Sequence, residues 1–368
     1  TFRKCQVSVE NATTGSNLVK LLEGASATVI TTIINKFETA VRGLKSPLTD
    51  PNIFVLIDEG HRSQYGEMGI KMEKALPNAC FIAMTGTPLM KKEKSTAAKF
   101  GGIIQPIYTV DQAVKDGAVV PLLYEGRMVP QEVHAESIDR YFDRICEWMT
   151  DAQRTDIKKK FSRADQVNQA EQRVYAIAWD ISQHFRKNWQ GSKFKAQLVA
   201  PRKRIAIMYK KFLDEIGIVS SEVLITSPDT REGEDVAFGE TSNTELAFWK
   251  QMMDEHGTPK KYEQNIINRF KNSDKPEIII VVDKLLTGFD EPKNTVLYLD
   301  RKLKDHTLLQ AIARVNRVCD DKEFGYIVDY YGVFSNLNDA LEIYTEFDQE
   351  DLSASTVPAL PPMFIPDG

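Results

Sequence analysis

The chain has 368 residues, 42% hydrophobic and 27% charged, with a formal net charge of −5, values that are ordinary for a soluble globular protein with two cores. No apolar run is long enough to cross a bilayer and no signal-peptide pattern opens the chain, so we expect no membrane association. The four cysteines have no CxxC spacing, which argues against a zinc site or a disulfide framework and favours a reducing, cytoplasmic setting.

The first informative stretch is an apolar, β-branched run at residues 28–33. It predicts a short strand that ends at Thr31 and Thr32, followed by a helix that begins at Asn35. Both threonines can be ordinary strand residues, and from the pattern alone that interpretation stays open.

The apolar run at residues 53–57 predicts a buried strand of a parallel sheet, and it stops at two adjacent carboxylates, Asp58 and Glu59. In open α/β sheets, ligands bind just beyond the carboxyl ends of the strands. Burying two carboxylates there costs free energy unless a cation neutralises them. Hydrated Mg²⁺ bound to a nucleoside triphosphate is the usual cation at such a position. The alternative is a solvated strand end followed by a polar turn.

A second apolar strand, predicted at residues 79–84, leads into Thr85-Gly86-Thr87-Pro88. Pro88 stops the strand and Gly86 permits a tight turn, so two hydroxyl groups are expected beside the carboxylates. The alternative is a plain turn that ends the strand.

The second half of the chain repeats a strand–helix rhythm, which predicts another parallel sheet. Arg202 lies just past the end of a predicted strand, and we weigh a contact with a phosphate group equally against simple surface solubility. Residues 227–257 are polar with little periodicity and predict an excursion or loop. Further strands are predicted at residues 122–129, 195–200, 221–225, 277–282, 294–299 and 325–329.

Two later stretches carry candidate functional residues. Residues 284–292 predict a loop after a buried strand, and residues 307–318 predict a helix. The spacing of Gln310, Arg314 and Arg317 places them on one face of that helix. An exposed, solvated helix face is the alternative.

These stretches occur in the order of the magnesium-binding, coupling and arginine-finger motifs of superfamily 2 helicases. The segments DEGHRSQYG, ALPNACFIAMTGTP and VVDKLLTGFDEPKNTVLYLDRKLKDHTLLQAIARVNR resemble the motor (R) subunit of type I restriction–modification enzymes. The resemblance extends from about residue 28 to 331, and its specificity comes from the ordered set of motifs.

The resemblance implies an α/β fold with two RecA-like domains whose sheets are mainly parallel. Residues 1–120 would be the C-terminal part of the first domain, truncated at its N-terminus, and residues 121–335 the second domain with a helical lead-in. Residues 336–368 would start a helical region and end in an extended tail.

The resemblance also implies roles in ATP hydrolysis. Asp58 would hold Mg²⁺ with Glu59, which also acts as the general base, and His61 would connect them to the coupling turn Thr85-Gly86-Thr87. Arg314 and Arg317, beside Gln310, would neutralise the γ-phosphate from the other domain, while Gly288 and Asp290 approach the nucleotide. Thr31, Thr32, Arg202 and Thr287 would contact DNA.

The sequence departs from the family in lacking the phosphate loop GxxxxGK[ST], for which residues 15–20 have the wrong spacing. We expect a chain that begins inside the first domain and hydrolyses ATP poorly alone, the alternative being a true loss of ATPase activity. Gly60 also stands where Ala or Cys is more usual. A nuclease pattern formed by Pro228, Asp229, Asp300 and Lys302 has irregular spacing, and we attribute it to chance.

The function implied is ATP-dependent translocation of double-stranded DNA before cleavage by an upstream nuclease domain. Methyltransferase and specificity subunits would be the partners. The net charge neither indicates nor excludes DNA, since a motor can hold phosphates with amides and hydroxyls. Another superfamily 2 DNA or RNA helicase, or a scaffold without catalysis, remains the alternative.

Overall fold

The structure is a computed structural model that describes residues 6–24, 29–58, 65–85, 100–102, 104, 108–127, 169–228, 241–303 and 305–332. The chain divides into two compact units, residues 1–107 and 108–368. The sequence placed this boundary at residue 120. The division lies earlier because the backbone N–H of Val120 donates to the carbonyl of Asn316 at 2.8 Å, and Val119 forms a bridge with Arg317.

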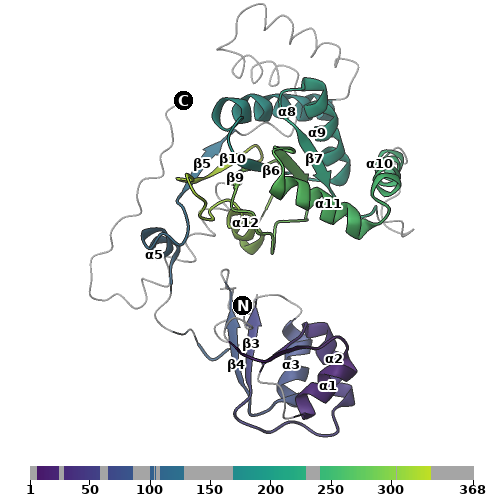
Figure 1. Ribbon diagram of the computed structural model, residues 1–368, viewed down its shortest axis with the longest axis vertical. Helices are drawn as coiled ribbons and strands as arrows, with labels where there is room; N and C mark the ends of the chain where they lie inside the picture. The colour runs from purple at the N-terminus through teal and green to yellow at the C-terminus, as the bar shows by residue number, and fades with distance from the viewer. Residues whose placement is uncertain are drawn as a thin grey trace, which may run out of the picture. The chain divides into compact units, whose positions relative to one another are not determined.

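The second unit contains a six-stranded sheet in which every pair of neighbours is parallel (Figure 1). Its strands match the six predicted from apolar runs, and the predicted α/β class with mainly parallel sheets is confirmed. In spatial order the strands are β5 (Leu122–Gly126), β10 (Gly325–Asp329), β9 (Asn294–Leu299), β6 (Lys195–Val199), β8 (Ile278–Val281) and β7 (Ser221–Leu224).

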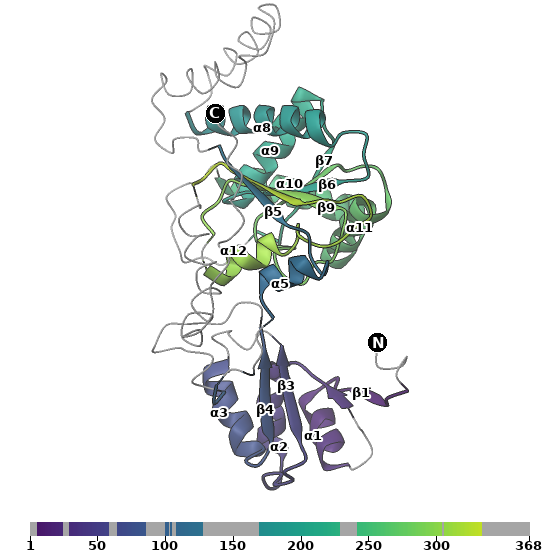
Figure 2. The same ribbon diagram turned by 90° about the vertical axis from the view of Figure 1, so that its left-hand side faces the viewer.

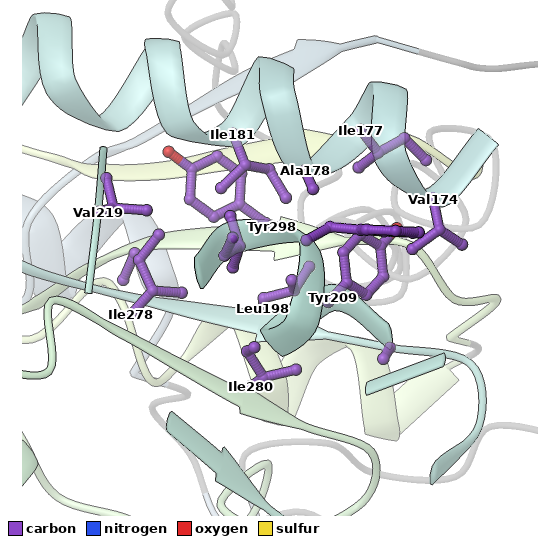
Figure 3. Packing of buried hydrophobic residues seen from close by; sticks show 14 of the residues in the cluster. Val174, Ile177, Ala178, Ile181, Leu198, Tyr209, Val219, Ile278, Ile280 and Tyr298 are labelled. Carbon is purple, nitrogen blue, oxygen red and sulfur yellow. The ribbon is translucent and has the colours of Figure 1, made fainter. Parts of the chain in front are cut away.

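Helices cover both faces of this sheet, which explains why β6, β8 and β9 are buried at every position. Leu198 of β6 packs toward α8 (Gln169–Asn188) and α9 (Lys203–Ile216), as Figure 3 illustrates. Ala196 of β6 belongs to the same cluster of buried residues. Val199 packs on the opposite face, with residues of α11 (Pro259–Asn272) and α12 (Asp305–Ile312). Figure 2 shows α8 and α9 on one side of the sheet and α12 on the other.

One expectation for the second unit was wrong. Residues 241–256, part of the segment predicted as a loop, form helix α10 (Thr241–His256). Several of its apolar residues pack inward: Met252 is buried, and the ring of Trp249 contacts that of Tyr262 edge-on, with the ring centroids 5.8 Å apart. The many polar residues of this helix concealed the apolar ones, so its periodicity was not visible in the sequence. Residues 229–240 lie outside the described residues.

The first unit contains two parallel strand pairs among its described residues. The pairs are β1 (Val9–Asn11) with β2 (Val29–Thr31), and β3 (Phe54–Asp58) with β4 (Cys80–Met84). Helices α1 (Gly15–Glu23), α2 (Ile34–Gly43) and α3 (Tyr65–Ala75) supply a small core that includes Leu18, Phe37 and Met72. Helix α5 (Val110–Lys115) belongs to the second unit. None of the helices in the described ranges has the length and apolar character needed to span a membrane.

A buried polar network attaches α8 to the edge of the large sheet. One guanidinium nitrogen of Arg127, just after β5, donates to both carboxylate oxygens of Asp180 at 2.8 Å, and Tyr330 donates its hydroxyl to Asp180 at 2.6 Å. The Nε of Arg127 also donates to Glu125 at 2.7 Å. Burial raises the pKa of Glu125, but the hydrogen bond and charge of Arg127 outweigh it, so the net pKa is lowered.

His184 of α8 makes this network sensitive to pH. Burial, followed by the nearby charge of Arg127, lowers the pKa of His184 to about 3, and its Nδ1 lies 3.0 Å from the hydroxyl of Tyr298. In the unfolded chain the imidazole of His184 is protonated below pH about 6.5, whereas in the folded protein it stays neutral down to pH about 3. The free energy of unfolding therefore falls by about 1.4 kcal/mol per pH unit as pH decreases from 6.5 toward 3.

We therefore expect wild type to lose about 2 kcal/mol more unfolding free energy than His184→Gln between pH 6.5 and 5. Denaturant unfolding followed by the fluorescence of Trp189, whose ring lies 5.0 Å from that of His184, measures this. Equal losses in the two proteins would contradict the expectation.

Candidate functional site

In the first unit, two of the predicted residues, Asp58 and Thr85, lie at the ends of neighbouring strands. Asp58, the last residue of β3, pairs in register with Met84, the last residue of β4, and Thr85 follows immediately. The side chain of Asp58 is exposed. Glu59, His61, Gly86 and Thr87 lie outside the described residues.

These residues suit a magnesium ion in their chemistry. A carboxylate at one strand end and a hydroxyl following the neighbouring strand are both hard oxygen ligands, which Mg²⁺ prefers, usually together with several waters. The exposure of Asp58 leaves room for such a hydrated ion.

The two predicted DNA-binding threonines of the first unit are both exposed. Thr31 ends β2, and its hydroxyl donates to the carbonyl of Glu10 at 3.4 Å. Thr32 follows, and its hydroxyl donates to the carbonyl of Ile33 at 3.4 Å. Such long bonds are weak, so both hydroxyls are available to an external acceptor.

In the second unit, a loop formed by residues 283–290 follows β8 and carries Thr287, Gly288 and Asp290. Phe289 anchors the loop in the core, whereas Thr287, Gly288 and Asp290 are exposed. Gly288 has φ +69°, a conformation that strains other residues, and no atom of the described residues beyond its two chain neighbours lies within 4 Å of the position that a Cβ would occupy. A ligand can therefore approach the backbone closely here.

The predicted arrangement of Gln310, Arg314 and Arg317 on one helix face is wrong. Helix α12 ends at Ile312, so only Gln310 is helical, and Gln310 is buried, with 7% of its surface exposed. The N–H of Ala313 still donates to the carbonyl of Leu309, four residues earlier. The next two N–H groups, of Arg314 and Val315, donate to carbonyls only three residues earlier, so the last turn is tighter than an α-helix. The helix ends there because the chain then continues alongside Val119. We call residues 313–317 the arginine turn.

The arginine turn nevertheless contacts the 283–290 loop. Arg314 donates from Nη1 to the carbonyl of Phe289 at 2.6 Å and from Nε to the carbonyl of Gln310 at 3.0 Å. Arg317 forms an ion pair with Asp290. Asp290 therefore holds Arg317, and a turn rather than a helix positions this arginine.

Arg202 is the exposed N-cap residue of α9, three residues past Val199 at the buried end of β6, and its side chain makes no capping hydrogen bond to the described part of the helix. Two residues further on, the backbone N–H of Arg204 donates to Oε1 of Glu245 in α10 at 3.0 Å.

The sequence reasoning missed a buried ion pair between Arg173 of α8 and Asp300, which follows β9. A signal was present, because Arg173 occupies the same helical stripe as Ile177 and Ile181, where an arginine requires a buried partner. Asp300 was considered only in the dismissed nuclease pattern. With 1% of its surface exposed and its oxygens occupied by protein donors, this carboxylate is unsuited to holding a metal.

Two family models match the chain in succession. Residues 1–155 match the SWI2/SNF2 ATPase, and residues 193–332 match domain 3 of the type I restriction enzyme subunit R. The HindI endonuclease subunit of a type I restriction enzyme from Haemophilus influenzae is 33% identical over 339 residues, which cover 86% of this chain and 30% of that protein. A homologue from Methanocaldococcus jannaschii, designated the MjaIXP endonuclease subunit, is 34% identical over 93% of this chain and 32% of its own length.

Solved structures resemble the chain in fold. A fragment of an HsdR subunit of a type I restriction enzyme from Vibrio vulnificus aligns with a TM-score of 0.54 at 16% identity, over 90% of this chain and 51% of that one. The Type ISP restriction–modification enzyme LlaBIII, solved bound to DNA, aligns with a TM-score of 0.50 at 14% identity, over 90% of this chain and 22% of that one. These likenesses concern the fold alone and agree with the predicted RecA-like architecture.

Proposed function

We propose a function for this chain from the premise that it belongs to the endonuclease-subunit family of type I restriction enzymes, spanning about a third of the length of the curated relatives it matches. The proposed function is ATP-dependent translocation along double-stranded DNA, which precedes cleavage by a nuclease domain elsewhere in the complete protein. The chain would supply the ATPase residues of that motor.

The observation that supports this proposal most strongly is the cluster formed by the 283–290 loop and the arginine turn. It joins an exposed glycine backbone, an exposed carboxylate and two guanidinium groups in one hydrogen-bonded arrangement. Guanidinium groups suit phosphates because their N–H groups match phosphate oxygens in geometry and charge.

We assign the chemistry of ATP hydrolysis to residues of both units. Asp58 would hold Mg²⁺, and bound Mg²⁺ would neutralise charge on the phosphates. Glu59 would take the proton of the attacking water, with His61 and the Thr85-Gly86-Thr87 turn coupling hydrolysis to movement. Arg314 and Arg317 would stabilise the negative charge that develops on the γ-phosphate, and Gly288 and Asp290 would border the nucleotide.

The DNA contacts in this proposal are contacts with phosphates, which position a duplex without reading its sequence. Thr31, Thr32, Arg202 and Thr287 are all exposed and carry suitable donors. Sequence recognition would then belong to a separate specificity subunit, which acts with a methyltransferase subunit in a cytoplasmic restriction complex.

ATP hydrolysis by the complete protein, compared with duplex DNA, single-stranded DNA, RNA and no nucleic acid, tests this function. We expect duplex DNA to raise turnover well above the other three conditions. Stimulation by RNA or by single strands alone would indicate another kind of superfamily 2 motor. Absence of turnover under all four conditions would indicate a scaffold without catalysis.

A further inference from the structure

Asp300 is a buried carboxylate that two elements of the second unit hold in place. Its Oδ2 accepts a hydrogen bond from the hydroxyl of Tyr209 in α9 at 2.6 Å, and its Oδ1 accepts one from Nη2 of Arg173 in α8 at 2.6 Å. The backbone N–H of Asp300 donates to the carbonyl of Val199 at 3.0 Å. A buried charge between two such donors cannot turn away without leaving a charge unpaired, so the backbone of Asp300 is fixed.

The next residue, Arg301, transfers this fixed position to the 283–290 loop. Its Nη1 donates to the carbonyl of Val282 at 2.8 Å and to Oδ1 of Asp283 at 2.5 Å. These contacts hold the chain where it leaves β8 and enters the loop. Arg301 therefore holds the start of the loop, and Arg314 and Arg317 hold its end.

The loop needs support at both ends because its backbone is strained. Leu285 has φ +63°, which is an uncommon conformation for a residue with a side chain. Such conformations persist only where the surroundings enforce them. Leu286 and Phe289 are buried and secure the middle of the loop, so its exposed residues depend on the orientation of the two ends.

We propose that Asp300, held by Arg173 and Tyr209, is a positioning residue that orients the 283–290 loop through Arg301. It thereby sets the positions of Gly288, Asp290 and the two arginines that contact the loop. The inference rests on the proposed ATPase function for its kinetic consequence, but the physical link from Asp300 to the loop does not depend on it.

The test compares Asp300→Asn with a matched control, Asp180→Asn. Both substitutions remove one carboxylate charge opposite an arginine, and both loosen the attachment of α8 to the sheet. Only Asp300 is followed by a residue that reaches the loop. Arg301→Met is the third variant. It removes the guanidinium group that contacts Val282 and Asp283, and it leaves the buried Arg173–Asp300 pair intact.

Hydrogen exchange of the backbone amides gives a readout that requires no ATP. Asp300→Asn and Arg301→Met should accelerate exchange within residues 283–290 by about tenfold or more, while Asp180→Asn leaves that segment at the wild-type rate. Unchanged exchange in the loop, or an equal acceleration in Asp180→Asn, would overturn the proposal.

Kinetics give the second readout. Both loop-directed variants should lower kcat for DNA-stimulated ATP hydrolysis by about tenfold to a hundredfold with little change in KM, because misplaced groups act on the transition state. Wild-type kcat in a variant whose loop exchanges faster would overturn the positioning role. A wild-type protein without ATPase activity would refute the proposed function, and hydrogen exchange would still decide the link from Asp300 to the loop.

Discussion

An Arg317→Ala variant of the complete protein should lose about 10³-fold or more of its kcat for ATP hydrolysis, the magnitude typical of arginines that neutralise a transferring phosphoryl group. Arg317 pairs with the exposed carboxylate of Asp290, and its own side chain is one-third exposed, so the guanidinium can be reached by a ligand. Arg317→Lys should be nearly as inactive, because an ammonium group lacks the planar pair of donors. Phosphate release under saturating ATP and duplex DNA measures both variants.

Arg269→Ala provides the matched control for this prediction. Arg269 also forms an ion pair within the second unit, with Glu222 at 3.0 Å, and its side chain is 46% exposed. Its partner Glu222 belongs to β7 and not to the 283–290 loop, so the loss of Arg269 should leave kcat within about twofold. Equal kcat values for Arg317→Ala and Arg269→Ala would remove Arg317 from the catalytic group.

A Glu59→Gln variant should lose about 10²- to 10⁴-fold in kcat while it still binds ATP, because glutamine keeps the shape of the side chain but cannot accept a proton. Glu59 directly follows Asp58, whose carboxylate ends β3 beside the Met84–Thr85 strand end. Single-turnover hydrolysis and equilibrium binding of ATP, measured on the same protein, separate the chemical step from binding.

The control for Glu59 is Glu73→Gln, which alters an exposed glutamate on helix α3 of the same unit. This change should leave both ATP binding and hydrolysis within about twofold of wild type. If Glu59→Gln hydrolyses ATP as fast as Glu73→Gln, Glu59 is not the general base.

The strands were the most predictable part of the fold. Runs such as Ile278–Val281 are apolar at every position because helices cover both faces of the sheet, and no other arrangement of so short a run buries it as well. Helix ends were less predictable. Nothing local in the sequence ends α12 at Ile312; the helix stops there because the chain must continue alongside Val119, which is distant in sequence.

The part of the candidate site that could be predicted from the sequence consists of residues that come soon after a strand ends. Asp58, Thr85, Arg202 and the 283–290 loop all lie where the apolar runs stop. The position of Arg173 in an apolar helical stripe predicts a buried partner, but it does not identify Asp300, because Arg173 and Tyr209 lie about a hundred residues away from Asp300 on two different helices. Such a link arises from tertiary packing, and a single sequence contains no spacing that reveals it.

Displacement of a third strand from linear duplex DNA tests the central claim most directly, with the complete protein assembled with its methyltransferase and specificity subunits. The account predicts that displacement requires ATP and starts after a delay that lengthens in proportion to the distance between the recognition sequence and the third strand. Glu59→Gln should abolish the displacement. ATP hydrolysis without displacement, or displacement with a delay independent of distance, would contradict the account.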